Sequence, residues 1–411
     1  MSINLNVNEF SGENYYIGYT PLPCKLLQSS SQELRVKLKN KVEDQGGQLV
    51  FRKQKSDVAV SELNLVIPAN GTPVEFFIAG KYRFASRADK DTVLVVTDAA
   101  SGMVLFEQAM MVRVRRNAND LSDHERKRFL DALFDFNKSG QYELFCDIHN
   151  DDGYGEAHRR YGFLPWHRAF LLDLERQLQI KYPDVTLPYW DFHKPAPKVF
   201  TPDFMGQPDS TNGRLKFNDS NPLFKWSVKG IDGLVRLNSF ANGTPTLKSL
   251  NETLGLSNLF SFANQVGMES NPHNNAHGSF GRGPVTNPVT APQDPIFYLL
   301  HCNVDRLWAV WQALYKRYDI NQTTTYPYVG NGSRTSGPFV GDFTKDTLWP
   351  WNQDVLPPRP AVRRGSGMPQ PVGYPAGSWP ESVFQMEQVI DYQGIHTDKP
   401  NYFDYEDIYF Q

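Results

Sequence analysis

The sequence has few cysteines and little charge bias. Only Cys24, Cys146 and Cys302 occur among 411 residues, and the formal net charge at pH 7 is -3. Three cysteines do not indicate a disulfide framework. A nearly neutral chain also lacks the strongly basic surface that nucleic acids and acidic membranes bind. The sequence therefore predicts neither a nucleic-acid partner nor a membrane partner.

Long apolar runs are also missing, and none is long enough to span a bilayer. The first residues, MSINLNVNEF, show no basic region followed by an apolar stretch, so a signal peptide is not expected. A cytoplasmic location is predicted, with assisted export left open. The last residues, EDIYFQ, resemble the remnant of a protease site and receive no weight in the functional prediction.

The chain is longer than a single core usually serves, so two domains are expected. Residues 1–108 predict a small all-β domain, an antiparallel sandwich, whose role the sequence does not indicate. The segments expected to form strands have strand length and apolar or alternating character, and turn signals separate them: 34–42, 48–53, 63–69, 74–80 and 92–98.

Residues 109–411 predict a mainly α-helical catalytic domain with long coil segments, mostly irregular from 193 to about 266 and coil-like at 321–382. Ser122 and Glu125 form a capping box ahead of helical periodicity, and a second helix, QYELFCDIH, ends at His149. A long amphipathic helix follows from residue 163 to residue 182. A further buried helix is expected from Asp294, where a capping carboxylate precedes a proline.

Six of the nine histidines fall into two trios within these helical segments. His273 and His277 are four residues apart, so on a helix they share one face. Six buried imidazoles without partners would be costly, whereas a shared metal centre satisfies them all. The first trio is His149, His158 and His167, and the second is His273, His277 and His301.

Imidazole ligands alone suit copper, zinc, iron or nickel. Two-zinc hydrolases and non-haem iron oxygenases normally add carboxylate ligands, and neither trio supplies one at a ligand position. Two neutral three-nitrogen sites facing each other favour a pair of copper ions, with open positions between them where dioxygen can bind. The pattern therefore indicates two copper ions as cofactors and dioxygen as a co-substrate.

These segments resemble the two copper-binding signatures of the type 3 copper proteins, the tyrosinase, catechol oxidase and haemocyanin superfamily. FCDIH, AHRRYGFLPWHRAFLLDLE and LPYWDF resemble the copper A signature. MESNPHNNAH and DPIFYLLHCNVDRLWAVWQ resemble the copper B signature. The resemblance covers about residues 110–317, with an aromatic pair at Tyr402 and Tyr405 like the family's terminal tyrosine motif. It implies a four-helix bundle around a dicopper site.

The resemblance also implies roles for individual residues. The first trio would bind copper A and the second copper B, while Glu269 and Asn274 would hold a water that accepts the phenol proton. Pro288 and Gly278 fall where relatives place residues at the entrance, and both suggest an open site. Many relatives carry a cysteine that forms a thioether to the second copper A ligand. That position is Glu156 here, so no thioether is expected.

Spacing along the last helix singles out two more residues. Phe297 lies one turn before His301, where it can stack on that ligand or simply pack in the core. Asp305 lies one turn after His301, where it can orient a ligand or form a plain ion pair with Arg306.

The leading hypothesis is a tyrosinase, a copper-dependent monophenol monooxygenase and o-diphenol oxidase of the polyphenol oxidase type, with phenolic small molecules as partners and melanin biosynthesis as the setting. A catechol oxidase, restricted to diphenols, is the nearest alternative. An oxygen carrier like haemocyanin is a third. The N-terminal domain could also shield the entrance as a latency plug.

Overall fold

The computed structural model describes residues 2–7, 15–41, 46–150, 157–158, 161–255, 267–326, 344, 346, 348–351, 386–397 and 403–410. The chain forms two compact units. Unit 1 contains Met1–Arg115 together with Tyr402–Gln411, and unit 2 contains Arg116–Pro371 and Gly377–Asn401. Among the described residues, no helix combines the length and apolar character that a bilayer crossing requires.

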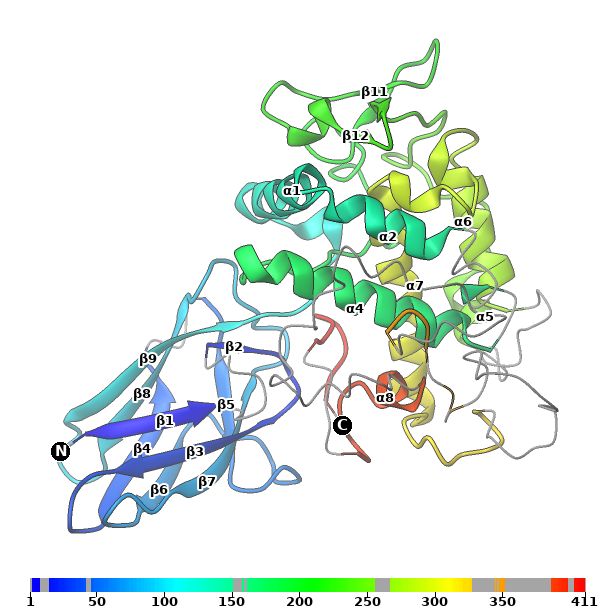
Figure 1. Cartoon of the computed structure of the whole chain (residues 1–411). Coiled ribbons are helices and arrows are strands. Elements are labelled where there is room, and N and C mark those ends of the chain that lie inside the picture. Colours follow the sequence, from blue (N-terminus) through cyan, green and yellow to red (C-terminus); the bar gives the residue numbers. More distant parts are fainter. Residues whose placement is uncertain are drawn as a thin grey trace. The chain divides into compact units, whose positions relative to one another are not determined.

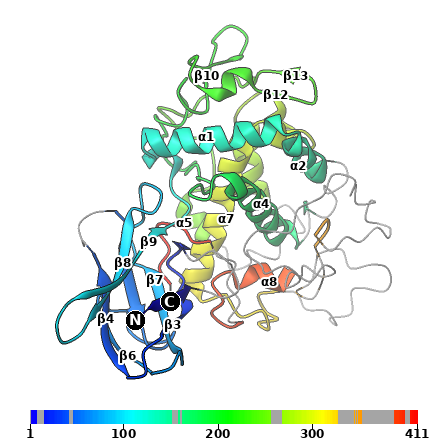
Figure 2. The same cartoon turned by 60° about the vertical axis from the view of Figure 1, so that its left-hand side comes forward.

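Unit 1 is built from two β-sheets, which Figures 1 and 2 show as the blue and cyan strands. The four-stranded sheet has the order β1-β3-β7-β5, and the five-stranded sheet has the order β2-β9-β8-β4-β6. The strands are β1 (Ile3–Val7), β2 (Tyr16–Ile17), β3 (Leu22–Gln28), β4 (Leu34–Asn40), β5 (Leu49–Arg52), β6 (Leu63–Ile67), β7 (Val74–Gly80), β8 (Thr92–Asp98) and β9 (Val104–Val112).

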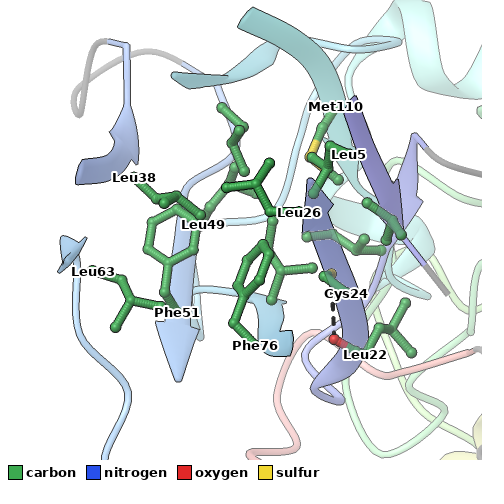
Figure 3. Close-up of a cluster of buried hydrophobic side chains, with 14 of the residues drawn as sticks. Leu5, Leu22, Cys24, Leu26, Leu38, Leu49, Phe51, Leu63, Phe76 and Met110 are labelled. Carbon is green, nitrogen blue, oxygen red and sulfur yellow. Dashed lines mark hydrogen bonds between the residues drawn. The ribbon is translucent and has the colours of Figure 1, made fainter. Parts of the chain in front are cut away.

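One hydrophobic core is shared by both sheets. Along β4 the side chains of Val36 and Leu38 are buried, whereas that of Lys37 between them is partly exposed, as a period of two requires. Leu26 and Phe76 of the other sheet point toward the same core, and Figure 3 shows the side chains of the two sheets meeting. This shared core makes unit 1 a sandwich-like β domain that precedes the helical region.

The predicted strands are all present, and the strand pairs of the two sheets are antiparallel as predicted except for one. β2 pairs parallel to β9, with Tyr16 opposite Met111. A parallel pair needs a long connection, and here the chain passes through most of the domain between these strands. β1, β2, β3 and β9 were not expected as strands. The boundary predicted after residue 108 lies inside β9, which ends at Val112.

The end of the chain belongs to unit 1. The carboxylate of Asp404 accepts hydrogen bonds from the backbone N–H and the hydroxyl of Thr20, at 2.9 and 3.0 Å. A Cβ atom on Gly18 would lie 2.2 Å from Asp404 Oδ2, so this close approach requires a glycine. The Arg115 guanidinium lies over the Phe403 ring, 4.1 Å from its centroid. The C-terminal residues are therefore part of the β domain's interior.

Unit 2 is mainly helical. Its longest helices are α4 (Phe163–Lys181) and α7 (Ile296–Tyr315), which pack against each other, and α4 also packs against α1. The capping box predicted at the start of α1 is confirmed, because Ser122 and Glu125 bond each other's backbone N–H groups. The other α-helices are α1 (Asp123–Lys138), α2 (Gln141–His149), α5 (Leu250–Leu254), α6 (Asn275–Gly278) and α8 (Met386–Ile390).

Short elements fill the connections. Two two-stranded ribbons, β10 (Gln207–Pro208) with β11 (Leu215–Lys216) and β12 (Ser227–Val228) with β13 (Ile231–Asp232), lie in the region expected to be irregular. The one-turn helices are η1 (Ala118–Asp120), η2 (Pro222–Lys225), η3 (Glu269–Asn274), η4 (Pro284–Thr286) and η5 (Ala291–Gln293). Most of the coil predicted at 321–382 lies outside the described residues.

A buried ion pair fixes the start of α7. Arg236 bonds both carboxylate oxygens of Asp294, at 2.7 and 2.5 Å, and donates to the carbonyl of Met205 at 2.7 Å. Asp294 also accepts a hydrogen bond from the backbone N–H of Ile296 at 3.1 Å. α7 begins at Ile296, one residue later than expected, so Pro295 occupies the N-cap position that was predicted for Asp294.

Asp173 on α4 gives a pH-dependent prediction. Burial raises the pKa of its carboxyl to about 6, although hydrogen bonds from Trp351 and Gln177 oppose the rise. The folded state therefore holds this proton more tightly than the unfolded state. The stability it contributes is complete below the unfolded pKa and is lost as the pH rises through about 6.

We expect Asp173→Asn to remove this loss, because a neutral amide needs no deprotonation. Relative to the wild type, the variant should gain stability as the pH rises from about 4 to about 6, by at most about 3 kcal/mol for a shift of about two pKa units, and the gain should stay constant at higher pH. Urea unfolding at several pH values measures the effect. Parallel stability profiles for the two proteins would contradict it.

Candidate metal centre

The first trio combines two helices and the segment between them. His149 is the last residue of α2, His167 lies in the second turn of α4, and His158 precedes α4. At most 5% of any of these side chains is exposed. The Nε2 atoms of His149 and His167 are 3.3 Å apart, and one nitrogen from each of the three rings lies within 4.8 Å of the others.

The second trio comes from η3, α6 and α7. His301 Nε2 lies 3.1 Å from His273 Nε2 and 3.0 Å from His277 Nε2. The helix that carries His273 and His277 is interrupted just before them, because Asn271 has an extended backbone, and between the two histidines η3 gives way to α6. The two rings still lie close, with centroids 4.7 Å apart.

The two trios lie side by side. The rings of His167 and His301 are stacked, with centroids 4.3 Å apart and planes at 17°. His158 and His273 lie opposite each other at 6.3 Å. Because α4 packs on α7, the six rings converge as the sequence predicts.

Backbone carbonyls orient three of the rings. The Nδ1 atoms of these rings lie 2.7 to 3.0 Å from carbonyl oxygens: His167 from Phe163, His273 from Glu269, and His277 from Val285. An Nδ1–H that donates to a carbonyl fixes the tautomer in which Nε2 carries a lone pair. In the second trio this fixes the lone pairs of His273 and His277, which both face His301 Nε2.

Burial keeps these rings neutral. Desolvation lowers the pKa of His149, His167, His273 and His301 well below 6.5, and it lowers the pKa of His277 to about 4. Neutral imidazole is the form that binds a metal. In each trio, one nitrogen atom of every ring lies within 4.8 Å of the others, which is an arrangement that could hold a metal ion. The residues present therefore fit two three-nitrogen copper sites.

A cavity of about 210 Å³ opens onto both trios. His167 and His301 lie behind the four histidines that line it. Glu269 is 3% exposed in this wall, whereas Asn274, Gly278 and Pro288 lie at the exposed part. The lining residues are His149, His158, His273, His277, Glu269, Asn274, Gly278, Thr286, Pro288 and Ala291.

Aromatic rings support ligands of both trios. Phe297 stacks on His301, with centroids 4.1 Å apart, and meets His149 edge-on at 4.8 Å. Phe163 meets His167 and His273 edge-on, each at 4.8 Å. Sequence reasoning singled out Phe297 but missed Phe163. The spacing in the sequence could have indicated Phe163 as well, because each phenylalanine lies one helical turn before a histidine on a long helix.

Phe297 is fully buried, so its removal has a predictable cost. We expect Phe297→Ala to lower the free energy of unfolding by about 3 to 5 kcal/mol through lost contacts and a new cavity. Denaturant unfolding of the metal-free protein measures this. Phe224→Ala is the control, because Phe224 is 56% exposed and should cost no more than about 0.5 kcal/mol.

Asp305 pairs with α4. Its carboxylate accepts a hydrogen bond from Arg168 Nε at 2.5 Å, and both side chains are at most 2% exposed. The pairing considered from sequence, with Arg306, joins neighbours on one helix, whereas this ion pair joins α4 to α7. Thr286 and Ala291 were missed as cavity residues because they lie in irregular connections. Glu156, where no thioether is expected, lies outside the described residues.

Comparison with known proteins places this site in a family. A family model described as the common central domain of tyrosinase matches residues 139–314. The chain is 31% identical over 272 residues to a tyrosinase of Streptomyces antibioticus, covering 59% of this chain and 94% of the relative. It is 26% identical over 217 residues to hemocyanin 2 of Megathura crenulata, covering 50% of this chain and 6% of that protein.

Among solved structures, the fold is similar to a polyphenol oxidase from Thermothelomyces thermophila, with a TM-score of 0.41 and 18% identity over 73% of this chain and 89% of that one. The family assignment rests on the sequence matches. All three cysteines are buried and free, and the two histidine trios are the groups among the described residues that could hold a metal ion. With nearly the full length of a tyrosinase matched and both trios in place, the chain belongs to the tyrosinase family of dicopper oxidoreductases.

Proposed function

We propose that the protein is a tyrosinase, which hydroxylates monophenols to catechols and oxidises o-diphenols to o-quinones with dioxygen. One observation carries this proposal: Glu269 and Asn274 line the same cavity as four of the copper-binding histidines. A phenol that enters the cavity therefore meets a carboxylate and an amide close to the metal ligands.

Glu269 has two functions in this proposal. Its backbone carbonyl orients His273 through Nδ1, and its side chain, with Asn274, holds a water in the cavity. A phenol has a pKa near 10, so few molecules are ionised at neutral pH. A positioned base that takes the phenolic proton raises the share of phenolate that can bind. The two copper ions, when bound, activate dioxygen.

The reaction balances without another reductant. One oxygen atom enters the ring position next to the phenolic oxygen, and the other leaves as water. The two electrons that this requires come from oxidation of the catechol to the o-quinone. Quinones polymerise readily, and a function in melanin biosynthesis fits this product.

The binding site has features that suit an aromatic ring. The rings of the four lining histidines provide flat surfaces on one side, and the exposed Pro288 and Gly278 leave the entrance without a large side chain at these positions. We propose that these two residues form the entrance. We further propose that α2, α4, α7 and the segment with η3 and α6 form the four-helix bundle predicted around the two ions.

A catechol oxidase would use the same metals but only diphenols, and an oxygen carrier would bind dioxygen without turnover. The test is a parallel assay of copper-loaded protein with a monophenol such as 4-methylphenol and with the matching 4-methylcatechol. Quinone formation from both supports a tyrosinase. Turnover of the catechol alone would favour a catechol oxidase. Reversible oxygen binding with no quinone from either would favour a carrier.

A further inference from the structure

The ion pair between Arg168 and Asp305 lies next to the point where the two trios meet. Arg168 directly follows His167 on α4, and Asp305 lies one turn after His301 on α7. His167 and His301 form the closest ring contact between the trios, at 4.3 Å. The same two helices thus carry one ligand of each trio and, beside it, one partner of the ion pair.

The guanidinium of Arg168 is held on several sides. Besides Asp305, it donates at 2.9 Å to the side-chain oxygen of Gln312 on α7 and to the carbonyl of Val389 on α8. It lies 3.6 Å from the ring centroid of Trp308, also on α7. Because the guanidinium is planar and its N–H donors point in fixed directions, it fixes both the distance and the orientation of its partners. A lysine ammonium cannot fix both.

We propose that Arg168 and Asp305 are positioning residues that set the separation between the two copper sites. Within each trio the ring nitrogens already lie close together, and carbonyl acceptors orient one ring of the first trio and two rings of the second, so each trio could hold an ion by itself. The separation of the trios depends on how α4 sits against α7, and the ion pair crosses that contact beside the ligands. Dioxygen activation by two ions requires both at a fixed, short distance.

The proposal rests on the dicopper centre but not on the choice of phenol. It predicts a separation of effects: changing the ion pair leaves copper binding intact but loosens the coupling between the ions. Two copper(II) ions at bridging distance pair their unpaired electrons and give no EPR signal. Ions whose separation varies give the signal of isolated copper(II).

The test variant is Arg168→Lys, which keeps the positive charge but loses the planar guanidinium with its directed N–H donors. We expect two copper ions per chain, the appearance of an EPR signal that the wild type lacks, and at least about a tenfold fall in kcat for a catechol. The matched control is Arg236→Lys, because Arg236 and Asp294 form an equally buried pair that does not join α4 to α7. The control should lose thermal stability to a similar extent while its bound copper stays EPR-silent.

Several outcomes would overturn the proposal. One is Arg168→Lys with full copper, no EPR signal and unchanged kcat. Another is an equal loss of stability and kcat in both variants without an EPR signal, because that marks a general structural role. If Arg168→Lys does not fold, Asp305→Glu carries the same expectations. Failure of both to fold, with Arg236→Lys folded, would also overturn it.

The proposed tyrosinase activity and the positioning proposal are contradicted by different results. A wild type that binds two EPR-silent copper ions but oxidises only catechols leaves the positioning proposal intact and removes the monophenol reaction. A wild type that binds fewer than two copper ions overturns the positioning proposal at its basis.

Discussion

His301→Ala should reduce the copper content from two ions per chain to one and lower the rate of catechol oxidation by more than about 100-fold. His301 Nε2 lies 3.1 Å from His273 Nε2 and 3.0 Å from His277 Nε2, so His301 contacts both other histidines of its trio. Its removal leaves His273 and His277 as a two-nitrogen site. Metal analysis after dialysis gives the copper content, and quinone absorbance gives the rate.

The control for this variant is His124→Ala. His124 is exposed on α1 and belongs to neither trio, so its replacement should leave copper content and rate unchanged. A His301→Ala protein that retains two ions per chain would refute the ligand assignment of the second trio.

Glu269→Gln should separate the two reactions. We expect monophenol hydroxylation to fall by about 10² to 10⁴-fold, because an amide cannot accept the phenolic proton. The backbone carbonyl that orients His273 is unchanged, so both copper ions should remain bound. Oxidation of a catechol forms no new C–O bond, and we expect it to change only slightly. Initial rates with a matched monophenol and catechol measure the ratio.

Glu252→Gln is the matched control, because Glu252 caps α5 and glutamine can take the same capping position. Its two rates should equal those of the wild type. Equal losses of monophenol and catechol oxidation in Glu269→Gln, with full copper, would show that the carboxylate does not act on the phenolic proton.

The copper-binding trios could be predicted from the sequence because local rules place their members. A histidine at the end of a short helix and another in the second turn of a long one need only helical periodicity to be located. His273 and His277 were expected on a continuous helix, and they lie close although the helix is interrupted, because the turn that contains both is regular.

Contacts between distant segments were harder to predict. Asp305 has a neighbouring cation in sequence, Arg306, but its ion pair is with Arg168 on another helix. Helical periodicity tells which face a residue occupies and does not tell which helix covers that face. The same limit explains why β2 was missed, since a strand of two residues is defined by its partner rather than by its own pattern.

The position of the last residues has a consequence for how the protein can be divided. Because Asp404 binds Thr20 and Arg115 lies over Phe403, segments on both sides of the oxidase domain pack within the β domain. A single proteolytic cut therefore cannot release either part. Deleting only the first 108 residues would expose the buried aromatic side chains of Phe403 and Tyr405, so a test of latency must remove both segments of the β domain together.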